Sequence, residues 1–156
     1  MSAPTRRGSL RWAVKSSFVH YVRTIAAGTC EAVGGAEVDA DGTFTFPLMG
    51  VAEDNGCQVL SFGGGARFFA HRGFLDVDLR GLELRFTQAG VDLTVEAAPG
   101  ARVTIATAEP AVPVKDGGLR WPGLVPCLTE AGAEIFGNVY PVGSELAPLD
   151  AVVLLD

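Results

Sequence analysis

The sequence predicts a mainly β protein, with antiparallel sheets in a sandwich-like meander, one N-terminal helix and a second short helix. The central two thirds of the chain repeats apolar and polar residues with a period of two, as strands half buried in a sheet do. Twenty glycines and nine prolines separate these segments as turns. At 156 residues, the chain is long enough for one core without disulfides. We expect residues 1–8 to form a tail and residues 9–156 a single domain.

The N-terminal helix is predicted from Leu10 to Gly28. Ser9 is a suitable N-cap, and Gly28 is a suitable stop. Between them, apolar residues recur at helical spacing: Leu10, Val14, Phe18, Val22 and Ile25. Ser17 and Tyr21 continue a row one turn apart beside this stripe, so we expect both hydroxyls to point toward whatever the helix packs on. His20 lies about 100° away around the helix and is expected to face solvent.

Strands are predicted wherever alternating, β-branched or aromatic residues lie between turn residues. These segments are Thr43–Pro47, Cys57–Phe62, Ala66–His71, Leu75–Phe86, Val91–Ala97, Ala101–Ala108 and a final strand at Ala151–Asp156. The proline-rich residues 110–126 are predicted to be a loop or an edge excursion. The second helix is expected within Leu128–Phe136.

Composition excludes several classes of function. The net charge is −6, and no run of basic residues is longer than Arg6-Arg7, so we expect no nucleic-acid partner. No stretch approaches the 18 or more apolar residues of a membrane span, and no signal peptide is visible, which predicts a cytoplasmic location for the chain as written. A trimmed form of an exported protein would instead be extracellular or at the cell surface.

Few motifs point to chemistry. The glycine run Gly63–Gly65 lacks phosphate-loop spacing and is interpreted as a turn. Asp76 and Asp78 share one strand face and are expected to be solvated rather than a glycosidase pair. The three cysteines have no disulfide or zinc spacing and are interpreted as small buried thiols: Cys30, Cys57 and Cys127. No serine lies in a GxSxG motif.

The candidate site residues are Ser17, Tyr21, His71 and Tyr140. The chain has only two tyrosines and two histidines. His71 ends an apolar strand where it opens onto a glycine turn. A tyrosine on a helix face is most often a packed residue with its hydroxyl at the rim, so these residues alone leave packing and ligation both open.

Four blocks of sequence, in order, resemble the HtaA domain, the haem-binding module of actinobacterial haem-uptake proteins. The first is LRWAVKSSFVHYV, residues 10–22, which is similar to the opening motif of that domain. The later blocks are DGTFTFP at 41–47, SFGGGARFFAHRGFLDVDL at 61–79 and FGNVYPVGSELAPL at 136–149. The chain departs from the family pattern at Ala13, which replaces a glycine, and at Arg72, where members often have a small or polar residue.

The resemblance implies a protein that holds ferric b-type haem non-covalently, with Tyr21 as the axial ligand of the iron. It also implies that His71 hydrogen-bonds the phenolate, that Ser17 contacts the haem or its propionates, and that Tyr140 lines the pocket. Phenolate is a hard anionic ligand suited to ferric iron, and an imidazole N–H favours the charged form of the phenol. Phe18 and Phe136 are expected to form apolar walls.

The function expected from this resemblance is haem acquisition, transfer or buffering, with other haem-carrier proteins as partners and without catalysis. Two alternatives stay open. One is a haem enzyme with catalase-like or peroxidase-like chemistry, in which Arg23 or Arg72 assists. The other is a cofactor-free interaction module, in which Tyr21 simply packs.

Overall fold

The computed structural model describes residues 7–73 and 75–154 and confirms a mainly antiparallel β fold with two helical regions. The strands are β1 (Arg7–Trp12), β2 (Thr29–Val33), β3 (Glu37–Val38), β4 (Phe44–Asp54), β5 (Cys57–Phe62), β6 (Gly65–Ala70), β7 (Leu75–Arg80), β8 (Glu83–Phe86), β9 (Val91–Ala98), β10 (Ala101–Ala108), β11 (Val114–Lys115), β12 (Gly118–Leu124), β13 (Cys127–Leu128) and β14 (Leu149–Leu154). The helical segments are α1 (Ser16–His20), the π-helix η1 (Tyr21–Ile25), the 3₁₀ turn η2 (His71–Gly73) and α2 (Glu130–Ile135).

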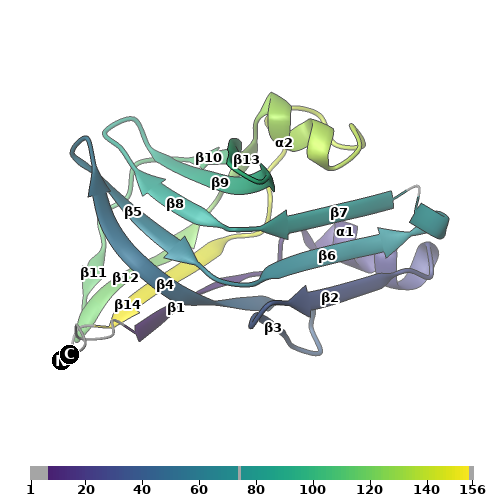
Figure 1. Ribbon diagram of the computed structural model, residues 1–156, viewed down its shortest axis with the longest axis horizontal. Helices are drawn as coiled ribbons and strands as arrows, with labels where there is room; N and C mark the ends of the chain where they lie inside the picture. Colours follow the sequence, from purple (N-terminus) through teal and green to yellow (C-terminus); the bar gives the residue numbers. More distant parts are fainter. Residues whose placement is uncertain (1–6, 74, 155–156) are drawn as a thin grey trace.

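Two sheets share these strands (Figure 1). The large sheet has the order β11-β12-β14-β1-β4-β5-β8-β9-β10-β13, with β3 paired to β4. The small sheet has the order β2-β6-β7. Strand β4 turns the corner of the large sheet, since its first half pairs with β1 and its second half with β5 across a bulge between Leu48 and Gly50. The helical segment η1 contacts β2 and β6 of the small sheet, and β6 leads into η2.

The predicted helical start at Leu10 was wrong. Arg7–Trp12 is strand β1, because Leu10 and Trp12 are buried while their neighbours face outward, a period of two. The backbone reverses at Val14, where φ is 62°, and only then does the helical region begin at Ser16. Its buried stripe is Phe18, Val19 and Val22, whereas Ile25 is 69% exposed.

Strand β1 also shows that the domain starts before residue 9. Arg7 lies opposite Leu154 in an antiparallel pair between β1 and β14, so the last two residues of the expected tail belong to the sheet. Residues 1–6 lie outside the described part of the chain, as do Leu155 and Asp156 of the expected final strand. The start of β1 and the end of β14 lie together at one end of the molecule, and α1 and the end of β6 lie at the other (Figure 1).

Most of the predicted strands are confirmed, with two corrections. Residues 75–86 form two strands in different sheets, β7 and β8, because the chain breaks at Gly81 with φ 61°. Residues 118–124, expected in a loop or edge, form β12, which pairs with β14 and buries Trp121. Within residues 110–126, the strand at an edge of the large sheet is β11. Strands β1, β2, β3 and β13 were not predicted.

The second helix, α2, is confirmed. Thr129 is its N-cap and accepts a hydrogen bond at its hydroxyl from the Gly132 N–H at 3.1 Å. The core is rich in aromatic residues, and the largest fully buried side chains of the described residues are Trp12, Trp121, Phe18, Phe44, Phe46, Phe68 and Phe136. Among the described residues, no helix has the length and apolar character needed to cross a membrane.

Candidate functional site

Tyr21 and His71 meet in the structure. The phenol Oη lies 2.9 Å from Nε2 of the imidazole, a hydrogen bond between residues fifty positions apart in the sequence. Tyr21 is the first residue of η1, and His71 is the first residue of η2, directly after β6. The contact therefore joins the helical region to the end of the small sheet.

Local backbone geometry brings these two side chains together. The N–H of Ala26 donates to the Tyr21 carbonyl, five residues back, so the chain leaves the helical region through a π-turn. Gly28 then passes against the end of β6, where a Cβ would overlap the carbonyl oxygen of Phe69 and the Cβ of Ala70. Only glycine permits this approach, which sets η1 beside His71.

The site is on the surface, contrary to the expectation that Ser17 and Tyr21 face the packed side of the helix. Ser17 is exposed, Tyr21 is 36% exposed, and His71 is exposed. The packed side is formed by Phe18 and Val22 instead. His20 is exposed as predicted and lies 3.4 Å from the Thr24 hydroxyl, so Tyr21 has one histidine partner and His20 lies outside the pair.

Phe18, Phe136 and Tyr140 form an aromatic group, and Phe18 precedes Tyr21 by three residues in the helical region. The Phe18 ring centroid lies 5.2 Å from that of Phe136 and 6.2 Å from that of Tyr140, with edge-to-face packing in both cases. Phe18 and Phe136 are 2% and 0% exposed, so they belong to the core, and both pack against the Tyr140 ring. Tyr140 is half-buried and is the most exposed of the three rings.

Two basic residues, Lys15 and Arg72, flank the candidate site residues in the sequence, and only Arg72 was considered in the sequence analysis. The Lys15 ammonium lies 5.0 Å from the centroid of the Tyr140 ring and donates to the Glu145 carbonyl at 2.9 Å. Arg72 follows His71 in the tight turn between β6 and β7 and is exposed. The only sequence signal for Lys15 was its proximity to Ser17.

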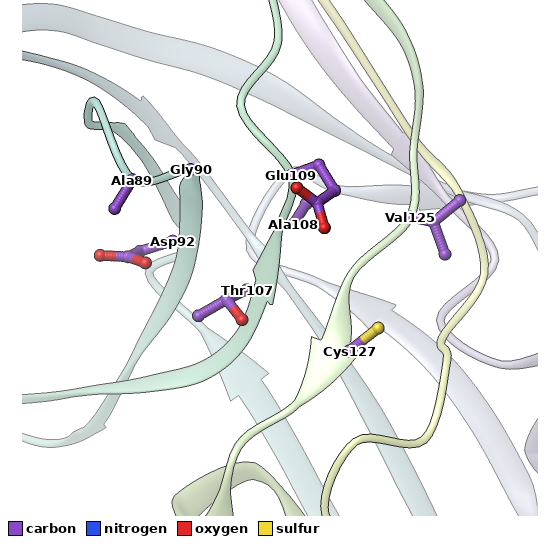
Figure 2. Close-up of a pocket in the computed structure, with 8 residues that line it drawn as sticks. All are labelled: Ala89, Gly90, Asp92, Thr107, Ala108, Glu109, Val125 and Cys127. Carbon is purple, nitrogen blue, oxygen red and sulfur yellow. The ribbon is translucent and has the colours of Figure 1, made fainter.

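Other hollows in the molecule do not contain these residues. Figure 2 shows one at the ends of β9 and β10, lined in part by Asp92, Glu109 and the Cys127 thiol. The two carboxylates and the thiol come from separate strands or loops, and no group of three metal-ligating side chains is found in the described part of the chain. A second hollow lies on the other side of α1 and includes His20 and Arg23. Arg23 donates to the Ala40 carbonyl there, away from the Tyr21–His71 pair.

The arrangement at Tyr21 suits an oxygen ligand for a hard cation. A neutral phenol can donate its proton to Nε2 or accept one from it, whereas a phenolate can only accept. His71 can therefore serve the phenolate as a hydrogen-bond donor from Nε2, and the exposure of Tyr21 leaves room for a second partner at Oη.

Comparison with known families decides the class of the protein. A model of the HtaA family matches residues 7–152, nearly the whole chain. The chain belongs to the HtaA family. Among proteins of curated function, no sequence matches it.

Solved HtaA structures have the same fold. The N-terminal domain of HtaA from Corynebacterium glutamicum is 21% identical with a TM-score of 0.80, and 96% of this chain and 98% of that chain are covered. The C-terminal domain of the same HtaA is 24% identical with a TM-score of 0.75, covering 94% and 96%. The heme binding protein HtaB of that organism is 21% identical with a TM-score of 0.75, covering 96% and 94%.

Proposed function

We propose that this HtaA-family protein binds one ferric b-type haem non-covalently, with the Tyr21 phenolate as the ligand of the iron. The observation that carries the proposal is the 2.9 Å contact between Tyr21 Oη and His71 Nε2 on an exposed surface. Membership of the HtaA family and the fold shared with the heme binding protein HtaB support it. The ferric ion supplies a hard Lewis acid that favours phenolate over phenol.

When Tyr21 binds iron, its phenol must lose a proton, and the hydrogen bond to His71 provides an acceptor for that proton. A phenol has an ordinary pKa near 10, so it must lose its proton at neutral pH to become a ligand. The proton on Oη can pass along the hydrogen bond to Nε2, and the imidazole then donates it back toward the phenolate oxygen. His71 thus stabilises the charged form without touching the metal.

The remaining candidate residues have supporting roles in this proposal. Ser17 lies one turn before Tyr21, and its exposed hydroxyl is available to a propionate. Tyr140 offers a half-buried aromatic ring to the porphyrin, and Phe18 and Phe136 hold that ring from below. Phe18 and Phe136 were expected to form apolar walls of the haem site. Because both are buried, their role in this proposal is to hold the Tyr140 ring in place.

A hemin titration of the purified chain, followed by absorption spectroscopy, tests the ligand. The chain has two tyrosines, which provides a matched pair of variants, Tyr21→Phe and Tyr140→Phe. Each removes one hydroxyl and keeps the ring. Saturation at one hemin per chain with a high-spin ferric tyrosinate spectrum, lost in Tyr21→Phe and kept in Tyr140→Phe, is the expected result. A tyrosinate spectrum that survives in Tyr21→Phe would rule out Tyr21 as the ligand.

The role proposed for the bound haem is acquisition, transfer or buffering, with other haem carriers as donors or recipients. An exposed site suits exchange, because a partner can reach the ligand directly. Incubation of the haem-loaded chain with apomyoglobin is expected to move haem to myoglobin without loss of protein fold. Sustained peroxide turnover by the loaded chain would instead favour a haem enzyme, and a melting temperature unchanged by hemin would favour a cofactor-free module.

A further inference from the structure

The turn between β6 and β7 has an unusual backbone. His71, Arg72 and Gly73 adopt positive φ angles in succession, of 51°, 55° and 97°. Glycine enters this left-handed region freely and asparagine or aspartate often does, but residues with long side chains do so rarely. Strain of this kind gathers at ligand sites, where the side chain is needed in that place. For His71 the reason is visible, because its ring holds the Tyr21 hydroxyl.

Arg72 has no such structural reason. Its side chain is exposed, and it forms no hydrogen bond or ion pair with any residue in the ranges 7–73 and 75–154. Five other arginines of the described chain have carboxylate partners within 4.0 Å: Arg11, Arg67, Arg80, Arg85 and Arg102. Arg7, Arg23 and Arg120 also have no carboxylate partner within the described residues, and Arg72 differs from them in following His71 directly.

We propose that Arg72 recognises a carboxylate of the molecule bound at Tyr21, and so selects porphyrins that carry free propionates. This inference rests on the proposed function. A planar guanidinium donates two parallel hydrogen bonds to a carboxylate, which gives direction as well as attraction. Because Arg72 is the next residue after His71, one turn carries both the imidazole that bonds Tyr21 and a guanidinium for a carboxylate at the porphyrin edge.

The test compares two probes on one set of variants. Hemin carries two propionates, and hemin dimethyl ester carries none; both are titrated in the same detergent solution. The variants are Arg72→Gln, which removes the charge, Arg72→Lys, which keeps it, and Arg120→Gln as a control at an exposed arginine on β12. Circular dichroism and a melting curve for each variant check that the fold is retained.

The wild type is expected to bind hemin more tightly than the ester. Arg72→Gln should weaken hemin binding by roughly three- to tenfold, as expected for an exposed charge-assisted contact, and leave ester binding unchanged. Arg72→Lys should retain part of the preference, and Arg120→Gln all of it. Raised salt should weaken hemin binding to the wild type more than to Arg72→Gln.

Two results would overturn the inference while the proposed function stands. One is hemin binding by Arg72→Gln with wild-type affinity. The other is an equal loss of hemin and ester binding in Arg72→Gln, which would mean that Arg72 supports the turn and does not read the carboxylate. A wild type that binds neither probe would reject the proposed function and this inference with it.

Discussion

Tyr21 and His71 share a hydrogen bond of 2.9 Å although fifty residues of chain separate them. A local sequence pattern does not predict this contact, because one partner belongs to a helical segment and the other follows the end of a strand. The close approach of Gly28 to β6 creates it. The predictions below test this pair and the structure that holds it.

Replacement of His71 by alanine is expected to weaken hemin binding about 10- to 100-fold and to shift the tyrosinate absorption band, because the phenolate loses its donor. His20→Ala is the matched control, since His20 is the other histidine and is exposed outside the pair. Titrations of both variants measure the effect. Equal losses in the two variants would contradict the role given to His71.

Gly28→Ala is expected to weaken hemin binding and lower the melting temperature together. A methyl group at this position meets the backbone of Phe69, so η1 must move away from β6 and Tyr21 from His71. Gly50→Ala is the control, because a Cβ there meets nothing within 4 Å and φ is not positive. Wild-type hemin affinity in Gly28→Ala would show that the close approach does not position the pair.

Phe18→Ala is expected to lower the free energy of unfolding by about 3–5 kcal/mol, as large-to-small changes in a core do. Phe18 is 2% exposed and packs against three other aromatic rings. Val139→Ala, at a residue 66% exposed in the same region, is expected to change it by less than about 0.5 kcal/mol. Urea denaturation measures both values, and similar values for the two would place Phe18 outside the core.

Thr129→Ala is expected to cost about 1–2 kcal/mol of stability, because the Thr129 hydroxyl caps α2 and also donates to the Thr104 carbonyl at 2.6 Å. Thr129→Ser keeps both hydrogen bonds and should retain most of the stability. Thermal unfolding distinguishes the two variants. If serine were as destabilising as alanine, the methyl group rather than the hydroxyl would matter.

The Cys30 thiol is expected to ionise at a higher pH in the folded chain than in the unfolded chain. Burial raises its pKa, and the nearby Arg23 lowers it by a smaller amount. A raised pKa in the folded state means that this group favours folding below the unfolded pKa and that the contribution is lost as pH rises through the folded pKa. The pH dependence of iodoacetamide labelling, read by mass spectrometry, measures this shift. Arg23→Gln should raise the pKa further, and a lower value in that variant would contradict the assignment.

The sequence was most informative where strands alternate and turns contain glycine. Cys57–Phe62 and Ala101–Ala108 were predicted with their observed bounds, because turn residues flank each of these segments on both sides. The N-terminal helix was placed too early because Leu10, Val14 and Phe18 satisfy a helical period by accident. Trp12 was the sign of a strand, since it repeats the burial of Leu10 two residues later.

For the site, the residue types were predictable but their surroundings were not. The positions of Tyr21 and His71 followed from the family motif, while the exposure of Tyr21 and Ser17 depends on how η1 and β6 pack. Residue spacing along a helix gives a direction only relative to the helix axis, and here the packed side lies at Phe18 and Val22. The left-handed turn at His71 and Arg72 is a product of tertiary structure, because neither residue favours that backbone by itself.

The pairing of β1 with β14 determines where this domain can be attached to a surface or to a second domain. Arg7 and Leu154 are neighbours across the sheet. The start of β1 and the end of β14 lie at the end of the molecule remote from α1 and the end of β6 (Figure 1). If a surface, a tether or a second domain is attached at this end, Tyr21 at the opposite end of the molecule stays accessible to a binding partner. By the same geometry, a short linker could close the chain into a circle and new ends could be opened in another loop, and the architecture around Tyr21 would be unaffected.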